Sequence, residues 1–178
     1  MTDEFRSRLV ALLPRLRRFA YALSRDVEHG DEIVQESCLR ALSRAEQWQP
    51  GTRFDSWMFR IAKNIWLDRL RARKVRGEQV DIDAMGGLPG SDGRQVVDSR
   101  LTLQAVNAGI ARLPPEEQVL VALVCIDGLS YKEAADIEEI PLGTVMSRLA
   151  RARRNLHAFL EQPAPQERRA TPPTGTRQ

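Results

Sequence analysis

The sequence predicts an all-α protein made of two small helical domains joined by a flexible linker. Apolar residues recur every three or four positions through the first 76 residues and again between residues 101 and 162, as on the buried face of an amphipathic helix. A stretch rich in glycine and acidic residues, at 77–100, separates the two blocks. No segment shows the sustained alternation of apolar and polar residues that marks a strand.

The first domain, residues 1–76, is expected to contain three helices. The first helix carries an apolar stripe made of Leu9, Leu12, Leu13, Leu16, Phe19, Ala20 and Leu23. The second runs from about residue 31 to residue 48, and a turn follows at 49–51, which contains proline and glycine. The third runs from about residue 54 to residue 73. Thr52 and Asp55 have the spacing of a capping box at its start.

The second domain, residues 101–162, is expected to end in two helices separated by a tight turn. An apolar helix over 116–127 precedes them and stops at Gly128. Ser130 and Glu133 form a predicted capping box for the next helix, which carries two small alanines where another helix could cross closely. A turn at 140–143 leads into a last helix from near Thr144. The tail, 163–178, is rich in proline, threonine, glutamine and arginine, and we expect it to be disordered.

Charge is distributed unevenly along the chain. The net charge is +3, yet residues 1–76 carry 16 basic against 10 acidic residues, and the linker carries 2 against 5. Cys38 and Cys125 stand alone in apolar stretches, so we expect two buried free thiols, which suit a reducing cytosol, and no metal site or other cofactor. The chain has no apolar run of about 20 residues and no signal peptide at its start. A cytoplasmic protein without membrane insertion is the expectation.

The last helix of the second domain has one apolar and one basic face. The predicted buried face contains Val145, Leu149, Ala152, Leu156 and either Phe159 or Leu160; the other face contains Thr144, Ser147, Arg148, Arg151 and Arg154. A short capped helix, a tight turn and a helix with an arginine face are typical of a helix-turn-helix, whose arginines reach phosphates and guanine edges in the major groove. The alternative is a solvated charged helix in a bundle, with Arg148 paired to Glu133 or Glu117.

The third helix of the first domain combines aromatic and basic residues. Five of the ten aromatic residues of the chain lie between Trp48 and Trp66, with basic residues interleaved. Such a mixture suits single-stranded DNA, because bases stack on rings while cations hold phosphates. The alternative is that each ring belongs to the core, which is the usual place of aromatic residues at helical spacing. One stripe cannot bury all of them, so the helix is either packed on two sides or exposes some aromatic surface.

Five segments together resemble the extracytoplasmic-function (ECF) group of the sigma-70 family. Residues 31–36 (DEIVQE) resemble the helix that binds core RNA polymerase, and residues 54–64 (FDSWMFRIAKN) resemble the segment that recognises the −10 element. Residues 113–118 (LPPEEQ) resemble the start of the fourth sigma domain. Residues 128–135 (GLSYKEAA) and 140–153 (IPLGTVMSRLARAR) resemble its −35-binding helix-turn-helix.

The resemblance implies an alternative sigma factor, not an enzyme, that binds core polymerase and directs promoter recognition, melting and initiation. Its implied partners are core RNA polymerase, promoter DNA and an anti-sigma factor that holds it inactive until a stress signal. The implied polymerase contacts are Asp31, Glu32, Gln35 and Glu36. The implied −10 contacts are Arg53, Phe54, Trp57, Arg60, Lys63 and Asn64, with Asn64 in the pocket for a captured base. The implied −35 contacts are Thr144, Met146, Ser147, Arg148, Arg151, Arg153 and Arg154.

One position departs from the family pattern. Met146 stands where many relatives carry arginine or lysine, and a thioether cannot donate a hydrogen bond to a guanine edge. The −35 bases that are read are therefore not fixed by the resemblance.

Two other functional classes have weaker support in the sequence. A stand-alone helix-turn-helix repressor or activator would explain residues 113–161 but would leave the first domain without a use and would need a dimerisation element. An enzyme has little support, because His29 and His157 have no carboxylate or cysteine partner at motif spacing and no phosphate-binding glycine loop precedes a helix.

Overall fold

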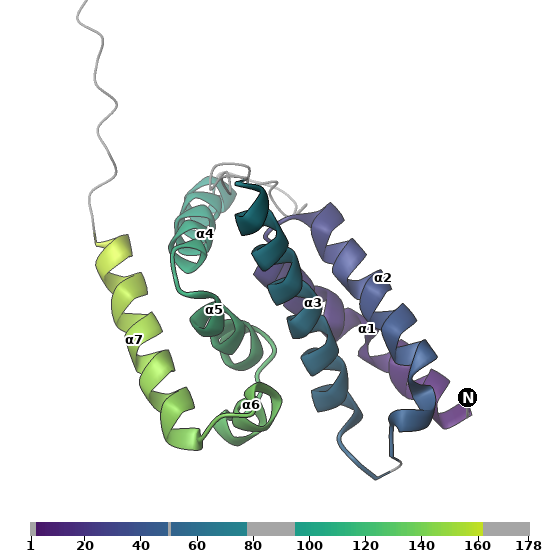
Figure 1. The fold of residues 1–178 in the computed structure, drawn as a ribbon. Helices are drawn as coiled ribbons and strands as arrows, with labels where there is room; N and C mark the ends of the chain where they lie inside the picture. The colour runs from purple at the N-terminus through teal and green to yellow at the C-terminus, as the bar shows by residue number, and fades with distance from the viewer. Residues whose placement is uncertain (1–2, 50, 78–94, 162–178) are drawn as a thin grey trace, which may run out of the picture.

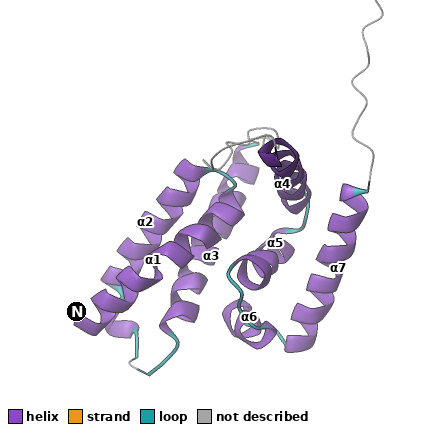
Figure 2. Cartoon of the chain, turned by 180° about the vertical axis from the view of Figure 1, so that it is seen from behind, coloured by secondary structure: helices purple, strands orange, loops and turns teal. Residues whose placement is uncertain are grey.

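The computed structural model describes residues 3–49, 51–77 and 95–161, and every regular element in these ranges is a helix (Figures 1 and 2). The all-α expectation is thus confirmed. The predicted tail and most of the predicted linker lie outside the described residues. Residues 95–100, which the sequence assigned to the linker, form the beginning of a helix. None of the described helices is both long and apolar enough to cross a membrane.

The first part of the chain is a three-helix bundle. It consists of α1 (Asp3–Ser24), α2 (Val27–Ser43) and α3 (Phe54–Arg76), with a short 3₁₀ turn at Ala45–Gln47. Asp26 caps α2 by accepting a hydrogen bond from the backbone N–H of His29, at 2.7 Å. The predicted Thr52 cap of α3 is wrong. The Thr52 hydroxyl donates to the carbonyl of Gln49 instead, and Arg53 is the N-cap residue, without a side-chain cap.

Helix α3 packs against α1 and α2 within the bundle, and its aromatic residues lie in two clusters along α1. Phe59 contacts Phe19 of α1 edge to face, with ring centroids 5.1 Å apart. Phe54 belongs to a second cluster near the start of α1, where its ring lies 5.2 Å from Phe5 and 5.4 Å from Trp48. Phe54, Phe59 and Trp66 are all buried. These three rings are therefore part of the hydrophobic core.

The second part of the chain comprises α4 (Gln95–Ala111), α5 (Pro115–Val121), a π-helical segment called η2 (Ala122–Ile126), α6 (Tyr131–Glu138) and α7 (Leu142–Leu160). Pro115 occupies the first position of α5, where its missing N–H is no loss. The predicted capping box of α6 is confirmed, because the Ser130 side chain accepts from the N–H of Glu133 while the Glu133 carboxylate accepts from the N–H of Ser130.

Helices α4 and α7 cross closely at Gly109. A Cβ atom at this position would lie 2.4 Å from Leu156 Cδ1 and 2.8 Å from Phe159 Cδ1. Phe159 also receives the guanidinium of Arg112 over its ring, 4.6 Å from the centroid. Of the two predicted alternatives for the end of the α7 apolar face, Phe159 is therefore the packed one, while Leu160 is exposed.

The π-helical segment turns one predicted core residue outward. Its i→i+5 hydrogen bond runs from the N–H of Asp127 to the carbonyl of Ala122, at 3.0 Å. Because a π turn adds a residue to the helix, the residues that follow are rotated relative to the α-helical pattern. Cys125 is exposed as a result, so the expectation of two buried thiols is wrong for it. Cys38 is half-buried, and burial raises the pKa of its thiol.

The two parts of the chain contact each other along α3. Helices α5 and α6 lie between α3 and α7 (Figures 1 and 2), α6 packs against α3, and η2 packs against α1. Polar contacts reinforce this arrangement: Arg25, in the turn between α1 and α2, donates to the side chain of Gln118 at 2.9 Å. The described residues therefore form one body with a common hydrophobic core.

Candidate nucleic-acid interface

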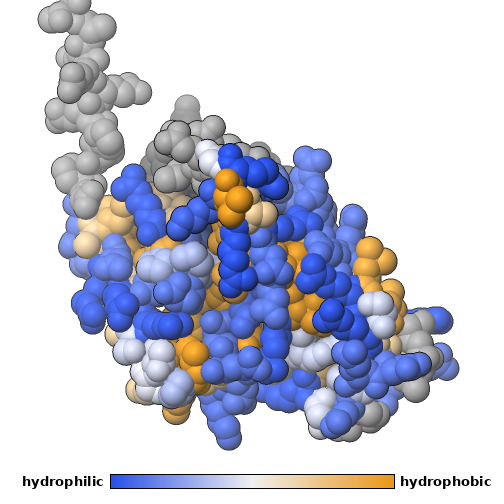
Figure 3. All heavy atoms as spheres, viewed as in Figure 1, coloured by the Kyte–Doolittle hydropathy of each residue, from blue (hydrophilic) through white to orange (hydrophobic). Residues whose placement is uncertain are grey.

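Helix α7 presents its polar face to solvent at the side of the molecule away from α3. Val145, Leu149 and Ala152 are buried beneath it. Ser147, Arg151 and Arg154 are exposed, whereas Thr144 and Arg148 are half-buried. In the view of Figure 1, Figure 3 shows mostly hydrophilic side chains on the face turned to the viewer, with hydrophobic residues in patches between them. The structure thus brings five of the predicted −35 residues, Thr144, Ser147, Arg148, Arg151 and Arg154, to one face of α7.

Two arginines of this face have partners inside the fold. Arg151 lies 3.5 Å from the buried carboxylate of Glu117, on α5, and Arg153 donates to the Tyr131 hydroxyl at 3.1 Å. The alternative considered from the sequence was an ion pair between Arg148 and Glu117 or Glu133. In the structure, Glu117 pairs with Arg151 instead. Met146 is 53% exposed, so its side chain is on the accessible surface and not in the core.

Glu117 is an unusual group beneath the helix. Its side chain is 1% exposed, and neither carboxylate oxygen has a hydrogen-bond partner. Burial raises the pKa of this carboxyl group, and the nearby Arg151 opposes that rise. Glu117 therefore supports the position of Arg151 while weakening the fold at neutral pH.

A second cationic surface lies on α3. Arg53, Arg60 and Lys63 point toward the second part of the chain, while Asn64 is exposed. Phe54, predicted to contact DNA, is 4% exposed, so its ring is not available for stacking on a base. Trp57 is half-buried, with its ring centroid 6.1 Å from that of Phe5.

Each of the three cations of this surface forms an ion pair with an acidic residue in or at the end of α6. Arg53 is paired with Glu133 and Arg60 with Glu139, at 2.8 Å in the second pair. Lys63 is 7% exposed, and its ammonium lies 3.3 Å from a Glu138 oxygen. Burial raises the pKa of the Glu138 carboxyl group, against the opposing effect of Lys63.

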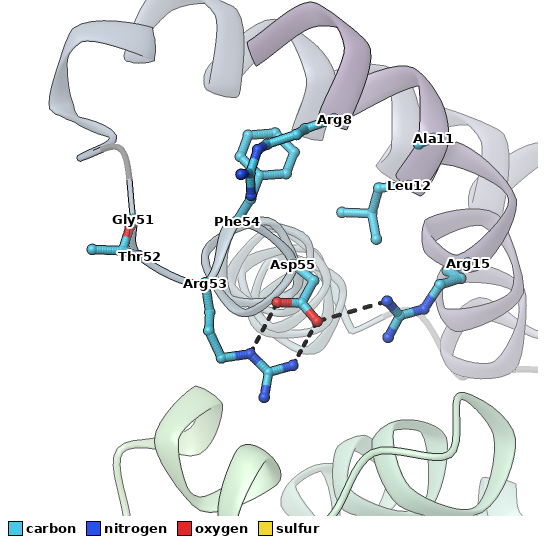
Figure 4. A pocket seen from close by; sticks show the side chains of 9 residues that line it. All are labelled: Arg8, Ala11, Leu12, Arg15, Gly51, Thr52, Arg53, Phe54 and Asp55. Atoms are coloured by element: carbon cyan, nitrogen blue, oxygen red, sulfur yellow. Dashed lines mark hydrogen bonds and ion pairs between the residues drawn. The ribbon is translucent and has the colours of Figure 1, made fainter. Parts of the chain in front are cut away.

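A hollow opens beside this surface, at the start of α3 (Figure 4). Its volume is about 440 Å³, and Arg8, Arg15 and Arg53 contribute cationic side chains to it while Leu12 and Phe54 contribute apolar ones. The Asp55 carboxylate bridges Arg53 and Arg15 across it, at 2.7 and 3.6 Å. Burial alone would raise the pKa of Asp55, but the hydrogen bonds from Arg53 and from the Ser56 N–H outweigh burial and lower it.

The residues of this hollow were only partly predicted. Arg53 and Phe54 were among the predicted DNA contacts, whereas Arg8 and Arg15 were not. Their separation of seven residues, which places two arginines on one face of α1, was the available signal. Asn64 does not line the hollow: it lies ten residues further along α3 than Phe54, about 15 Å at the rise of an α-helix.

The predicted polymerase-binding residues share the outer side of α2. Gln35 is exposed. Arg69 of α3 donates to Glu32 at 2.6 Å and to Glu36 at 2.9 Å, and the Tyr21 hydroxyl donates to Asp31 at 2.8 Å. Three of the four side chains are thus held by neighbours within the bundle, and Gln35 lies among them on the surface.

Comparison with known proteins finds one family model for each of the two parts of the chain. The family model for Sigma-70 region 2 matches residues 9–76, and that for Sigma-70 region 4 matches residues 103–156. The chain belongs to the sigma-70 family, and relatives 30–34% identical to it over more than four fifths of both chains place it among the ECF sigma factors. As an ECF sigma factor, it is an alternative sigma factor that directs promoter-specific initiation of transcription.

Individual relatives cover nearly the whole chain. The ECF RNA polymerase sigma factor EcfG of Rhodopseudomonas palustris is 34% identical over 160 residues, which are 90% of this chain and 87% of the relative. SigW of Bacillus subtilis is 30% identical and covers 82% of this chain and 83% of its own length. Among solved structures, the sigma factor RpoE of Bartonella quintana, in complex with the anti-sigma factor NepR, superposes with a TM-score of 0.72 at 25% identity. That alignment covers 90% of this chain and 99% of RpoE.

Proposed function

We propose that this sigma factor divides promoter recognition between its two cationic surfaces. The face of α7 enters the major groove of the −35 element, and the α3 surface, with the hollow beside it, holds the single strand of the melted −10 element. The observation that carries this proposal is the exposed Ser147, Arg151 and Arg154 on a helix that follows a capped helix and a tight turn.

The chemistry of the α3 surface suits a single strand. Arg53, Arg60 and Lys63 offer cations at the spacing of one helix face, and the hollow combines three arginines with apolar walls. A base taken out of the stack needs an apolar surface and groups that can hydrogen-bond to its edge. Asn64, an exposed amide that can both donate and accept, is the proposed reader of a base held along α3 outside the hollow.

The outer side of α2 is the proposed contact with core polymerase, with Gln35 as the side chain free to reach it. An anti-sigma protein is a proposed partner, because the Bartonella quintana relative was solved with one. Since core polymerase and promoter DNA are found in the bacterial cytoplasm, that is the proposed site of action.

Run-off transcription with purified core polymerase on genomic fragments tests the proposal. Promoter-specific transcripts that depend on the added chain are the expected result. Asn64→Ala should slow opening or change the −10 preference while leaving −35 binding intact. Normal opening on every −10 variant would contradict the role of Asn64. Tight binding of the isolated protein to a palindromic duplex would favour a repressor.

A further inference from the structure

The α3 surface proposed to bind the −10 strand is occupied within the molecule. We call Arg53, Arg60 and Lys63 the α3 cations, and Glu133, Glu138 and Glu139 the α6 acids. Each of the three cations is ion-paired with one of the three acids. A phosphate backbone would have to compete with these carboxylates for the cations.

Backbone groups at the end of α6 strengthen the pairing. Arg60 donates to the carbonyl of Asp136 at 2.7 Å, and Lys63 donates to the carbonyl of Ile137 at 3.3 Å. The last carbonyls of a helix carry partial negative charge, because no further turn takes up their hydrogen bonds. The C-terminal end of α6 therefore offers α3 both carboxylates and carbonyl oxygens, which are the two kinds of acceptor that imitate a phosphate.

Lys63 is the most completely covered of the three cations, since the side chains of Arg53 and Arg60 remain 45% and 38% exposed. Lysine is almost never fully buried unless it is paired. Lys63 is 7% exposed here, and α6, which packs against α3, provides both of its partners. The only other lysines of the chain, Lys74 and Lys132, are both exposed.

We propose that the C-terminal end of α6, together with Glu133 in the first turn of that helix, is an internal competitor of promoter DNA, which closes the α3 cations in the free sigma factor. This inference rests on the proposed −10 function of α3. Closure and capture of the single strand are mutually exclusive, because both use the same three cations. The pairs of Arg53 and Arg60 are partly exposed and stabilise little individually, and the buried Lys63–Glu138 pair must offset the desolvation of both groups. The closed state therefore opens when a stronger partner holds the two parts of the chain apart.

Acylation of lysine amines with an N-hydroxysuccinimide ester, followed by peptide mass spectrometry, tests closure on the full chain. Lys74 and Lys132 serve as exposed references within the same molecule. In the wild-type protein, Lys63 should be acylated at least about tenfold more slowly than either reference, because buried amines are not accessible to the reagent. Equal rates for the three lysines would overturn the proposal, whatever α3 binds.

Glu139→Arg is the opening variant, because it places a cation opposite Arg60 and leaves both partners of Lys63 unchanged. Glu139 is largely exposed, so the substitution spares the core. Lys63 acylation should rise several-fold in this variant and less in Glu139→Gln, which removes the pair without repulsion. Glu161→Arg is the matched control: it changes the charge equally at the end of α7, where Glu161 contacts His157, and should leave Lys63 protected.

Binding of a fluorescein-labelled single-stranded DNA 12-mer of mixed sequence tests the competition. Glu139→Arg should bind it several-fold more tightly than Glu161→Arg, although both variants carry the same net charge. Equal affinities of the two variants would overturn the competition. Run-off transcription by the wild-type protein tests the proposed function without reference to closure, so the two failures can be distinguished.

Discussion

The guanidinium group of Arg15, on α1, donates two hydrogen bonds to the carboxylate of Asp127, at the end of the π-helical segment. Arg15 Nη2 lies 2.6 Å and Nε 3.2 Å from Asp127 Oδ2, and the Asp127 side chain is completely buried. A two-pronged contact of this kind is stronger than a single exposed ion pair. It connects residues 112 positions apart in the sequence and fastens the second part of the chain onto the first.

Arg15→Ala should destabilise the protein, because it leaves a buried carboxylate with only the more distant Arg18, at 3.5 Å. The expected loss is about 1–3 kcal/mol in the free energy of unfolding, measured by urea titration. Arg71→Ala removes an exposed pair with Asp68 and should change stability by less than about 1 kcal/mol. Similar losses in both variants would mean that the Arg15–Asp127 contact stabilises the fold no more than an exposed ion pair does.

Gly30→Ala should destabilise the bundle through the contact between α1 and α2. A Cβ atom at residue 30 would lie 2.1 Å from Tyr21 Cδ1, and the hydroxyl of Tyr21 is held by Asp31. We expect a loss of about 1–3 kcal/mol in thermal or urea unfolding. Gly143→Ala, on α7, meets nothing within 4 Å and is the control, expected to be neutral or slightly stabilising. A stable Gly30→Ala variant would contradict the close approach.

Glu117→Gln should stabilise the protein at neutral pH. Because burial raises the pKa of Glu117 in the folded state, the folded protein binds this proton more tightly than the unfolded chain. The wild-type protein should therefore lose stability as the pH rises from the ordinary glutamate range toward neutrality, and the variant should not lose this part. A gain of about 1 kcal/mol at pH 7 is expected from urea titrations across pH. A variant with the wild-type pH profile would exclude Glu117 as the source.

The arginines of α7 should separate into two groups in −35 binding assays. Arg148→Ala or Arg151→Ala should reduce affinity by about 1–3 kcal/mol and relax preference at one base position. Arg153→Ala or Arg154→Ala should weaken binding to all −35 variants alike. Each should also lower the magnitude of the slope of log affinity against log salt concentration by about one. Thr144 and Ser147, nearer the start of the helix, belong with the first group. Equal losses on every variant for Arg148 and Arg151 would refute base reading.

Gln35→Ala should weaken assembly with core polymerase while leaving DNA contacts intact. Gln35 is exposed on α2, a helix that carries neither of the two cationic surfaces. The measurement is a fluorescence titration of labelled sigma factor with core polymerase, alongside −35 binding as the control. An unchanged affinity for the polymerase would refute the assignment.

The comparison of sequence with structure shows which features depend on local rules. The cap of Ser130 and Glu133 was predictable because four consecutive residues contain all its groups. Thr52 and Asp55 have the same spacing but form no capping box. The Thr52 hydroxyl donates to the Gln49 carbonyl instead, and the Asp55 carboxylate accepts from Arg53. The exposure of Cys125 depends on a π turn that has no simple sequence signal. The pairs of Arg15 with Asp127 and Lys63 with Glu138 depend on how the two parts dock, which periodicity within one helix does not encode.

The aromatic clusters of the first bundle make the two parts of the chain optically distinct. All three tryptophans, Trp48, Trp57 and Trp66, belong to that bundle, and the second part has none. Trp48 and Trp66 are buried, so their emission shifts when the bundle that carries α3 melts. Far-ultraviolet circular dichroism follows the helices of both parts. Coincident transitions would mean that the two parts unfold as one cooperative unit, and separated ones would measure how weakly docking couples them.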